Sequence, residues 1–261
     1  MSITTSNLTP EKQRLYEQIV DALYALFGAH PGYWPVHAKG LVCEGAFSPA
    51  ATAASVSRAP HLQGTSVPIT VRFSDFAGVP TVSDGDPLAS PRGMAIKFHL
   101  PGGMDTDIVA QSYDGFPVRT AEAFLVFVRA LAASGPGVSS PTPLANFLAS
   151  HPQVKRFVEA PKPAPASFAT ESYYGVNAFR FTNRDGASRN VRYRVRAEAG
   201  KEHLDAAEAG PPTGEFSPRR ACGGARGRRL RAFGPGAGYD RARQDRESER
   251  PKGRRCPRSG P

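Results

Sequence analysis

The sequence has few cysteines, and the three that it has are widely separated. Cys43, Cys222 and Cys256 lack the short pairwise spacing of a metal-binding motif, so neither a zinc site nor a disulfide framework is predicted. No apolar run approaches the about 20 residues needed to cross a bilayer, so no membrane partner is expected. The first residues also lack a cationic stretch followed by an apolar one, as in a secretory signal, so we expect a cytoplasmic protein.

Positive charge is concentrated at one end of the chain. The net charge is +10 over 261 residues, but residues 211–261 hold 13 Arg and one Lys against five acids, a balance of +9. The first 210 residues are therefore near neutral at +1, which predicts no specific nucleic-acid partner for them. Of the last 51 residues, 29 are Arg, Gly or Pro, and this composition predicts a disordered tail. The composition of these residues also resembles that of a polypeptide translated from GC-rich DNA in the wrong reading frame.

Periodicity and capping residues predict an α+β fold. Thr9 as N-cap, Pro10 after it and Gly28 as terminator predict a helix over residues 9–28, and further helices are expected within residues 120–160. Short alternating segments predict strands between residues 35 and 110 and again between 172 and 200. The sequence therefore predicts one domain over residues 1–210, followed by the tail over residues 211–261.

Sequence motifs in a fixed order carry a resemblance to a known family. Residues 36–40 read Val-His-Ala-Lys-Gly, residues 71–74 Val-Arg-Phe-Ser, residues 91–98 Pro-Arg-Gly-Met-Ala-Ile-Lys-Phe, and residues 115–119 Gly-Phe-Pro-Val-Arg. Together they resemble the distal haem pocket of the catalase superfamily, and the last is most similar to the short catalase-related peroxidases. The resemblance covers roughly residues 10–205. It implies a catalase-like antiparallel β-barrel with flanking helices and haem b as the cofactor.

The resemblance also implies catalytic roles for three side chains. His37 corresponds to the histidine above the haem, which moves the peroxide proton from one oxygen to the other, and a neutral imidazole suits this work. Ser74 corresponds to the serine that fixes the plane of that ring, and Gln111 to the distal amide. Judged alone, a histidine in an apolar strand is more often structural, and Ser74 is compatible with an ordinary strand serine.

Four further residues are implied to hold the cofactor. Arg72 corresponds to an arginine that pairs with a haem propionate, which its planar guanidinium suits. Val36 would narrow access to the iron, while Phe116 and Phe124 would pack on the macrocycle. From the residues alone, Arg72 is also compatible with a solvated surface arginine, and either phenylalanine with an ordinary core.

The chain departs from the family pattern at three places. Trp34 stands where members usually have a second arginine for a propionate, and Gln111 stands where they usually have asparagine. Catalase iron is held by a tyrosinate, normally within Arg-x-x-x-Tyr. No such spacing occurs after residue 200, where the only tyrosine is Tyr239 and Pro235 stands four residues before it. No metal ligand is therefore identified from the sequence.

These observations lead to one main hypothesis and two alternatives. The main hypothesis is a haem-dependent peroxidase that reduces hydrogen peroxide or organic hydroperoxides with a small organic reductant, as a monomer or simple homo-oligomer. The first alternative is an inactive catalase-like remnant that binds haem weakly or not at all. The second is a nucleic-acid-binding protein that uses the basic tail, and it would show a steep dependence of binding on salt.

Overall fold

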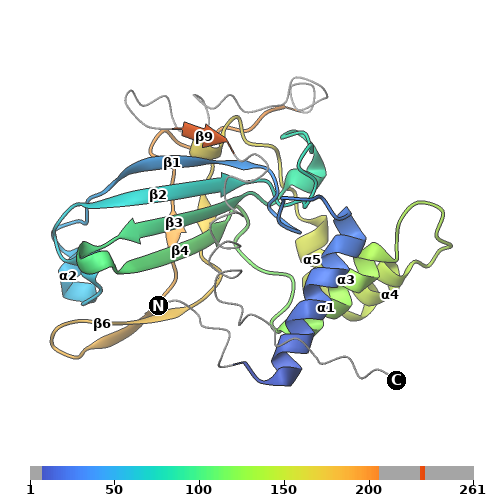
Figure 1. Ribbon diagram of the computed structural model, residues 1–261, viewed down its shortest axis with the longest axis horizontal. Helices are drawn as coiled ribbons and strands as arrows, with labels where there is room; N and C mark the ends of the chain where they lie inside the picture. Colours follow the sequence, from blue (N-terminus) through green and yellow to red (C-terminus); the bar gives the residue numbers. More distant parts are fainter. Residues whose placement is uncertain (1–7, 206–229, 233–261) are drawn as a thin grey trace, which may run out of the picture.

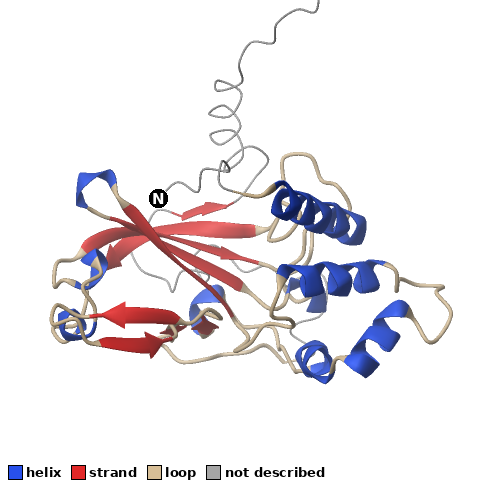
Figure 2. Cartoon of the chain, turned by 90° about the horizontal axis from the view of Figure 1, so that it is seen from below, coloured by secondary structure: helices blue, strands red, loops and turns tan. Residues whose placement is uncertain are grey.

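The chain, described here from a computed structural model, forms one large antiparallel sheet with the longer helices gathered at one end of it (Figure 1). The structure describes residues 8–205 and 230–232. A separate two-stranded hairpin lies beside the large sheet (Figure 2). Strands and helices are thus both present, and the predicted α+β class is confirmed.

The helices begin and end largely where capping residues predict. In α1 the Thr9 hydroxyl accepts a hydrogen bond from the Lys12 amide, and Gly28 ends the helix with a φ of 84°. Thr120 and Thr142 cap α3 and α4 in the same way. The α-helices are α1 Pro10–Phe27, α2 Ala53–Val56, α3 Ala121–Ala132, α4 Pro143–Ser150 and α5 Pro152–Glu159. None of the helices in the described part is both long and apolar enough to span a bilayer.

The strands are β1 Gly40–Phe47, β2 Val67–Ser74, β3 Gly93–His99, β4 Asp105–Gln111, β5 Tyr173–Tyr174, β6 Phe179–Thr182, β7 Ser188–Val191, β8 Arg194–Val195 and β9 Leu230–Ala232. Their order in the main sheet is β8-β5-β4-β3-β2-β1-β9, and β6 pairs with β7. The antiparallel pairing was expected. Over the described residues, however, the sheet is open, because β8 and β9 are its two edges and do not pair with each other.

The strand register places the motif residues on one face of the sheet. Ser74 of β2 pairs with Gly93 of β3, which in turn pairs with Gln111 of β4. Side chains of directly paired residues point to the same face, and residues two apart along a strand share it. Arg72 therefore lies on the face of Ser74. The opposite face carries the buried apolar row Leu41, Phe73, Met94 and Ala110.

The strands expected between residues 172 and 200 include a hairpin. Its strands β6 and β7 pair in register from Phe179↔Val191 to Thr182↔Ser188, on either side of Asp185-Gly186. The predicted disorder of residues 211–261 concerns a region outside the described residues, except for β9, which pairs with β1. Cys43 in β1 is disulfide-bonded, a pairing that the wide cysteine spacing did not predict.

Candidate active site

His37 lies in the short segment that leads into β1, and that segment is tied to the end of β2. The His37 amide donates to the Phe76 carbonyl at 2.9 Å, and the Asp75 amide donates to the Lys39 carbonyl at 3.0 Å. The backbone of His37 has a φ of 55°, a left-handed conformation that is uncommon outside glycine. Such a conformation persists only where surrounding contacts hold it, and here the backbone pairing does so.

The imidazole of His37 is held through its Nδ1 atom. Nδ1 lies 3.0 Å from the Asp75 carbonyl oxygen and 3.1 Å from the Ser74 hydroxyl. Because a carbonyl oxygen only accepts, Nδ1 carries the hydrogen in the neutral ring, and Nε2 is left with a lone pair. The predicted pairing of Ser74 with the ring of His37 is therefore present in the geometry.

Burial keeps the His37 ring neutral. The pKa of His37 is lowered to about 4, first by burial and second by the nearby Arg72 cation, while the hydrogen bond to Asp75 opposes both. The ring also meets the Phe76 ring edge-on, with centroids 5.8 Å apart. At neutral pH the Nε2 atom of His37 is thus available as a proton acceptor.

Gly93 lies directly against the imidazole ring of His37. A Cβ atom at this position would lie 2.7 Å from the Ser74 hydroxyl oxygen and 2.9 Å from Cε1 of His37. Both distances are shorter than van der Waals contact, so only glycine allows β3 to pass this close. The Arg-Gly of residues 92–93 therefore has a direct steric role at the candidate site.

Gln111 belongs to the same row of paired residues across the strands. Gly93 lies between Ser74 on one side and Gln111 on the other. Its amide nitrogen donates to the carbonyl of Gly115, which orients the side chain along its own loop. The structure therefore brings the three predicted catalytic residues, His37, Ser74 and Gln111, to one end of one face of the sheet.

Arg72 contacts the segment that carries His37. Its guanidinium donates to the His37 carbonyl at 2.7 Å, and burial lowers the pKa of Arg72. The Arg72 side chain is therefore partly buried and bonded to the backbone, rather than fully solvated. This position supports both the unusual backbone of His37 and the neutral state of its ring.

The predicted apolar contacts of the cofactor lie where α1, α3 and the segment before β1 meet. Val36 and Phe124 pack against the same cluster of α1 and α3 side chains. The rings of Phe116 and Phe124 are 5.6 Å apart, and Phe116 is 49% exposed. Both rings line a cavity of about 620 Å³, to which Arg119 and Arg192 also contribute. Trp34, at the position of the missing arginine, is exposed.

An apolar strip on the His37 face is open to solvent. Val109 of β4 is 72% exposed, and the register places it next to Ala95, which pairs in turn with Arg72. Most strand valines at the centre of a sheet are covered on folding. This strip, flanked by Arg72 and by the row of Ser74 and Gln111, suits a flat apolar group with an acidic edge.

A buried ionic network beneath His37 was not found from the sequence. Arg92 pairs with Asp75 at 2.5 Å, and its other terminal nitrogen donates to the Asp84 carbonyl. The Asp84 carboxylate pairs with Lys39 at 3.0 Å. Burial raises the pKa of Asp75, and the Arg92 cation opposes that rise and favours the charged carboxylate. No local sequence pattern indicates that these charged residues are buried together, so the network is seen only in the structure.

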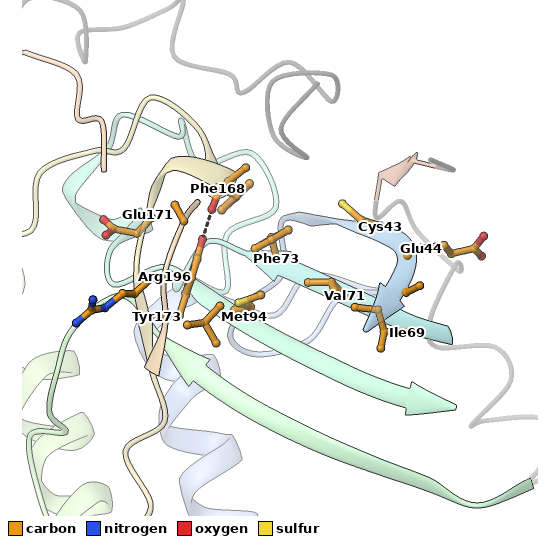
Figure 3. Close-up of a pocket in the computed structure, with 15 residues that line it drawn as sticks. Cys43, Glu44, Ile69, Val71, Phe73, Met94, Phe168, Glu171, Tyr173 and Arg196 are labelled. Carbon is orange, nitrogen blue, oxygen red and sulfur yellow. Dashed lines mark hydrogen bonds between the residues drawn. The ribbon is translucent and has the colours of Figure 1, made fainter. Parts of the chain in front are cut away.

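A second cavity, of about 230 Å³, lies on the opposite face of the sheet (Figure 3). Phe73, Met94 and Tyr173 line it, and the Tyr173 hydroxyl donates to the Phe168 carbonyl at 2.9 Å. At its edge, the buried Glu171 pairs with Lys201 at 2.7 Å. None of the predicted site residues lines this cavity, so it belongs to the core on the other side of the sheet.

No described residue is assigned to the axial position of a haem. In the whole sequence the Arg-x-x-x-Tyr spacing occurs once, at Arg189 and Tyr193. These residues belong to the hairpin region rather than to a helix, and the Tyr193 ring packs against Phe179 and Phe181 at 5.5 and 5.7 Å. Tyr239 lies outside the described residues. The described part of the chain also contains no group of three or more His, Cys, Asp or Glu suited to a metal ion.

Comparison with known protein families assigns the chain to a family. A sequence model described as Catalase matches residues 34–217, which include every predicted site residue. The chain belongs to the catalase family. The sequence-based recognition is thereby confirmed, and the unmatched remainder includes most of the basic tail.

Individual relatives of this catalase-family chain agree with that assignment. It is 38% identical over 208 residues to a catalase-related peroxidase of Mycolicibacterium paratuberculosis, covering 78% of this chain and 63% of that protein. It is 30% identical over 197 residues to a catalase-related peroxidase of Synechococcus elongatus, covering 74% and 57%. The chain thus spans less than two thirds of the length of these curated relatives.

Solved structures confirm the fold of the family. A fungal catalase superposes with a TM-score of 0.58 at 21% identity, covering 80% of this chain and 41% of that chain. A bacterial catalase gives the same TM-score of 0.58 at 20% identity. The predicted catalase-like arrangement of strands and helices is therefore present, although the sheet of the described residues is open.

Proposed function

We propose that this catalase-family protein is a haem-dependent peroxidase whose distal base is His37. The observation that carries the proposal is the state of the imidazole: Nδ1 donates to the Asp75 carbonyl, and the pKa of His37 is lowered to about 4. A neutral ring with its Nε2 lone pair free is the form that removes a proton from a hydroperoxide. The membership of the catalase family supports the same reaction class.

The residues on the His37 face fit one side of a haem. Catalases bind haem iron through a tyrosinate, and the bound haem supplies the metal centre at which the peroxide is reduced. We propose haem b, with the exposed Val109 strip and Phe116 against the macrocycle. Arg72 would lie toward a propionate, while Val36 and Phe124 would close the edge beside α1 and α3.

His37 would carry one proton through the reaction. Nε2 takes the proton of the peroxide O–H group and returns it to the other oxygen, which leaves as water or an alcohol when the O–O bond breaks. Ser74 and the Asp75 carbonyl keep the Nδ1 hydrogen in place during both transfers. Gln111, held by its bond to Gly115, would direct its amide toward the bound peroxide.

A small organic reductant balances the electrons of this reaction. One hydroperoxide and one two-electron donor give an alcohol, water and the oxidised donor, ROOH + AH₂ → ROH + H₂O + A. The cavity beside Phe116 and Phe124 is lined mainly by apolar groups and by Arg119, which suits a small organic molecule. We further propose a cytoplasmic protein that acts as a monomer or simple homo-oligomer. Nucleic-acid binding depends on the basic tail, which lies outside the described residues.

Titration of the purified full-length chain with haemin, followed by peroxide and an organic donor, tests this proposal. We expect a saturable Soret band at a 1:1 ratio and peroxide-dependent oxidation of the donor. Absorbance of free haemin alone, with no saturation, would contradict the proposal and favour the inactive remnant. A steep salt dependence of RNA binding without a Soret band would favour the nucleic-acid alternative.

A further inference from the structure

The ion pair between Arg92 and Asp75 lies in the interior of the sheet end that carries His37. The side chains of Arg92 and Asp75 are 1% and 0% exposed, and they are 2.5 Å apart. A buried ion pair is often no more stable than apolar residues of similar size, since both charges lose their hydration. Its presence here therefore suggests a role other than stability alone.

Asp75 connects this pair directly to the imidazole of His37. The backbone carbonyl of Asp75 accepts the Nδ1 hydrogen, while the Asp75 amide donates to the Lys39 carbonyl. The Asp75 side chain is anchored by Arg92, which is itself held by the Asp84 carbonyl. The orientation of that carbonyl, and hence of the ring, depends on where Arg92 holds the side chain.

The backbone of Arg92 is also connected to Gly93, which lies against the imidazole, and to the strand end that carries the amide side chain of Gln111. Gly93, the residue after Arg92, lies against the ring of His37. The Arg92 amide donates to the Ser112 hydroxyl, and the Ser112 amide donates back to the Arg92 carbonyl, both at 2.9 Å. Ser112 directly follows Gln111. Arg92 thus connects the histidine, the glycine beneath it and the strand end that carries the amide.

We propose that Arg92, through Asp75, is a positioning residue that keeps His37 in the Nδ1-protonated tautomer with Nε2 free. The pair acts on the ring without touching substrate or cofactor. This inference rests on the proposed peroxidase function, because only a distal base needs Nε2 unprotonated. Arg72 is the cation that lowers the pKa of the ring, whereas the Arg92–Asp75 pair acts on it through the backbone carbonyl of Asp75.

The test uses the haem-free full-length chain labelled with ¹⁵N at histidine, so that its result does not depend on haem uptake. In the wild type we expect the Nδ1-protonated tautomer of His37 and a titration midpoint well below 6.5. The double variant Asp75→Asn/Arg92→Met removes both charges while nearly preserving volume. It should lower the ratio of Nδ1- to Nε2-protonated tautomer about tenfold. Because the hydrogen bond to Asp75 raises the pKa of His37, its loss should also move the titration midpoint further down.

Lys97→Met is the matched control, because it removes a cation from β3, the strand that begins directly after Arg92. Lys97 forms exposed ion pairs with Asp105 and Asp107, so its loss should leave His37 unchanged. A folded double variant with unaltered His37 tautomer and midpoint would overturn the proposal. Should the double variant not fold, an Nε2-protonated His37 in the wild type would overturn it equally. Failure of haemin binding would instead count against the proposed function alone.

Discussion

At the scale of single residues, the chemistry of His37 is set by groups that mostly carry no charge. The Asp75 carbonyl and the Ser74 hydroxyl meet Nδ1, and burial shifts the pKa of the ring further than any neighbouring charge does. His37 and Ser74 were predictable because they belong to short motifs. The part played by Asp75 was not, because it acts through its backbone and through a partner, Arg92, that is 17 residues away.

The lowered pKa of His37 predicts a pH dependence of folding stability. The folded pKa is about 4 and the unfolded value is about 6.5, so between these values the unfolded chain binds more protons. Stability should therefore rise from pH 4 to pH 6.5, by up to about 3 kcal/mol from this residue. Above pH 6.5 its contribution should be constant.

Urea unfolding of the wild type and of His37→Gln at pH 4.5 and pH 7.5 measures this contribution. Burial also lowers the pKa of His61, which adds in the same direction, and the raised pKa of Asp75 acts in the opposite direction. The difference between the two proteins isolates His37. An identical change in both proteins between the two pH values would refute the assignment.

Gly93→Ala should damage the site sterically. Its Cβ atom would lie 2.7 to 3.0 Å from atoms of Ser74 and His37, and relief of this overlap should cost about 1–3 kcal/mol of unfolding free energy. Gly45→Ala in β1 is the control, because its Cβ atom would meet Ile69 at an ordinary 3.8 Å. Chemical denaturation of both variants checks the difference, and equal stabilities would contradict the account.

At the scale of elements, the helices were the most predictable part. Threonine caps and prolines mark the starts of α1 and α4, and the bounds of α1 differ from the predicted residues 9–28 by one residue at each end. Strands were predicted between residues 172 and 200 without individual bounds, and the structure places β6 and β7 directly on either side of the Asp185-Gly186 turn. The pairing of β9 was unpredictable, since three residues within an Arg- and Gly-rich stretch carry no strand pattern.

Helix α3 connects the packing of the helices with the candidate site. Phe124 packs toward α1 and against Phe116, whereas Val126, two residues later, is 52% exposed. Phe124→Ala should lower the unfolding free energy by about 2–4 kcal/mol and weaken haemin binding. Val126→Ala should change stability by less than about 0.5 kcal/mol. Thermal melts and haemin titrations of the two variants would contradict this account if they were alike.

At the scale of the whole molecule, one sheet separates two different environments. One face carries His37, Arg72 and the exposed Val109, and the other is packed around Phe73 and Tyr173. The family assignment could be made from motifs along the sequence, but this separation depends on strand register. The buried pair at the sheet end depends on it as well, because Asp75 directly follows β2, Arg92 directly precedes β3, and the two meet where Ser74 pairs with Gly93.

The most direct test of the central claim is the rate at which the haem-loaded protein reacts with peroxide in a stopped-flow experiment. His37→Gln should slow this reaction at least about 100-fold while haemin affinity changes little, because general acid–base catalysis contributes that much or more. His99→Gln, at an exposed histidine of β3, should react like the wild type. If His37→Gln reacted within about threefold of the wild type, His37 would not be the distal base.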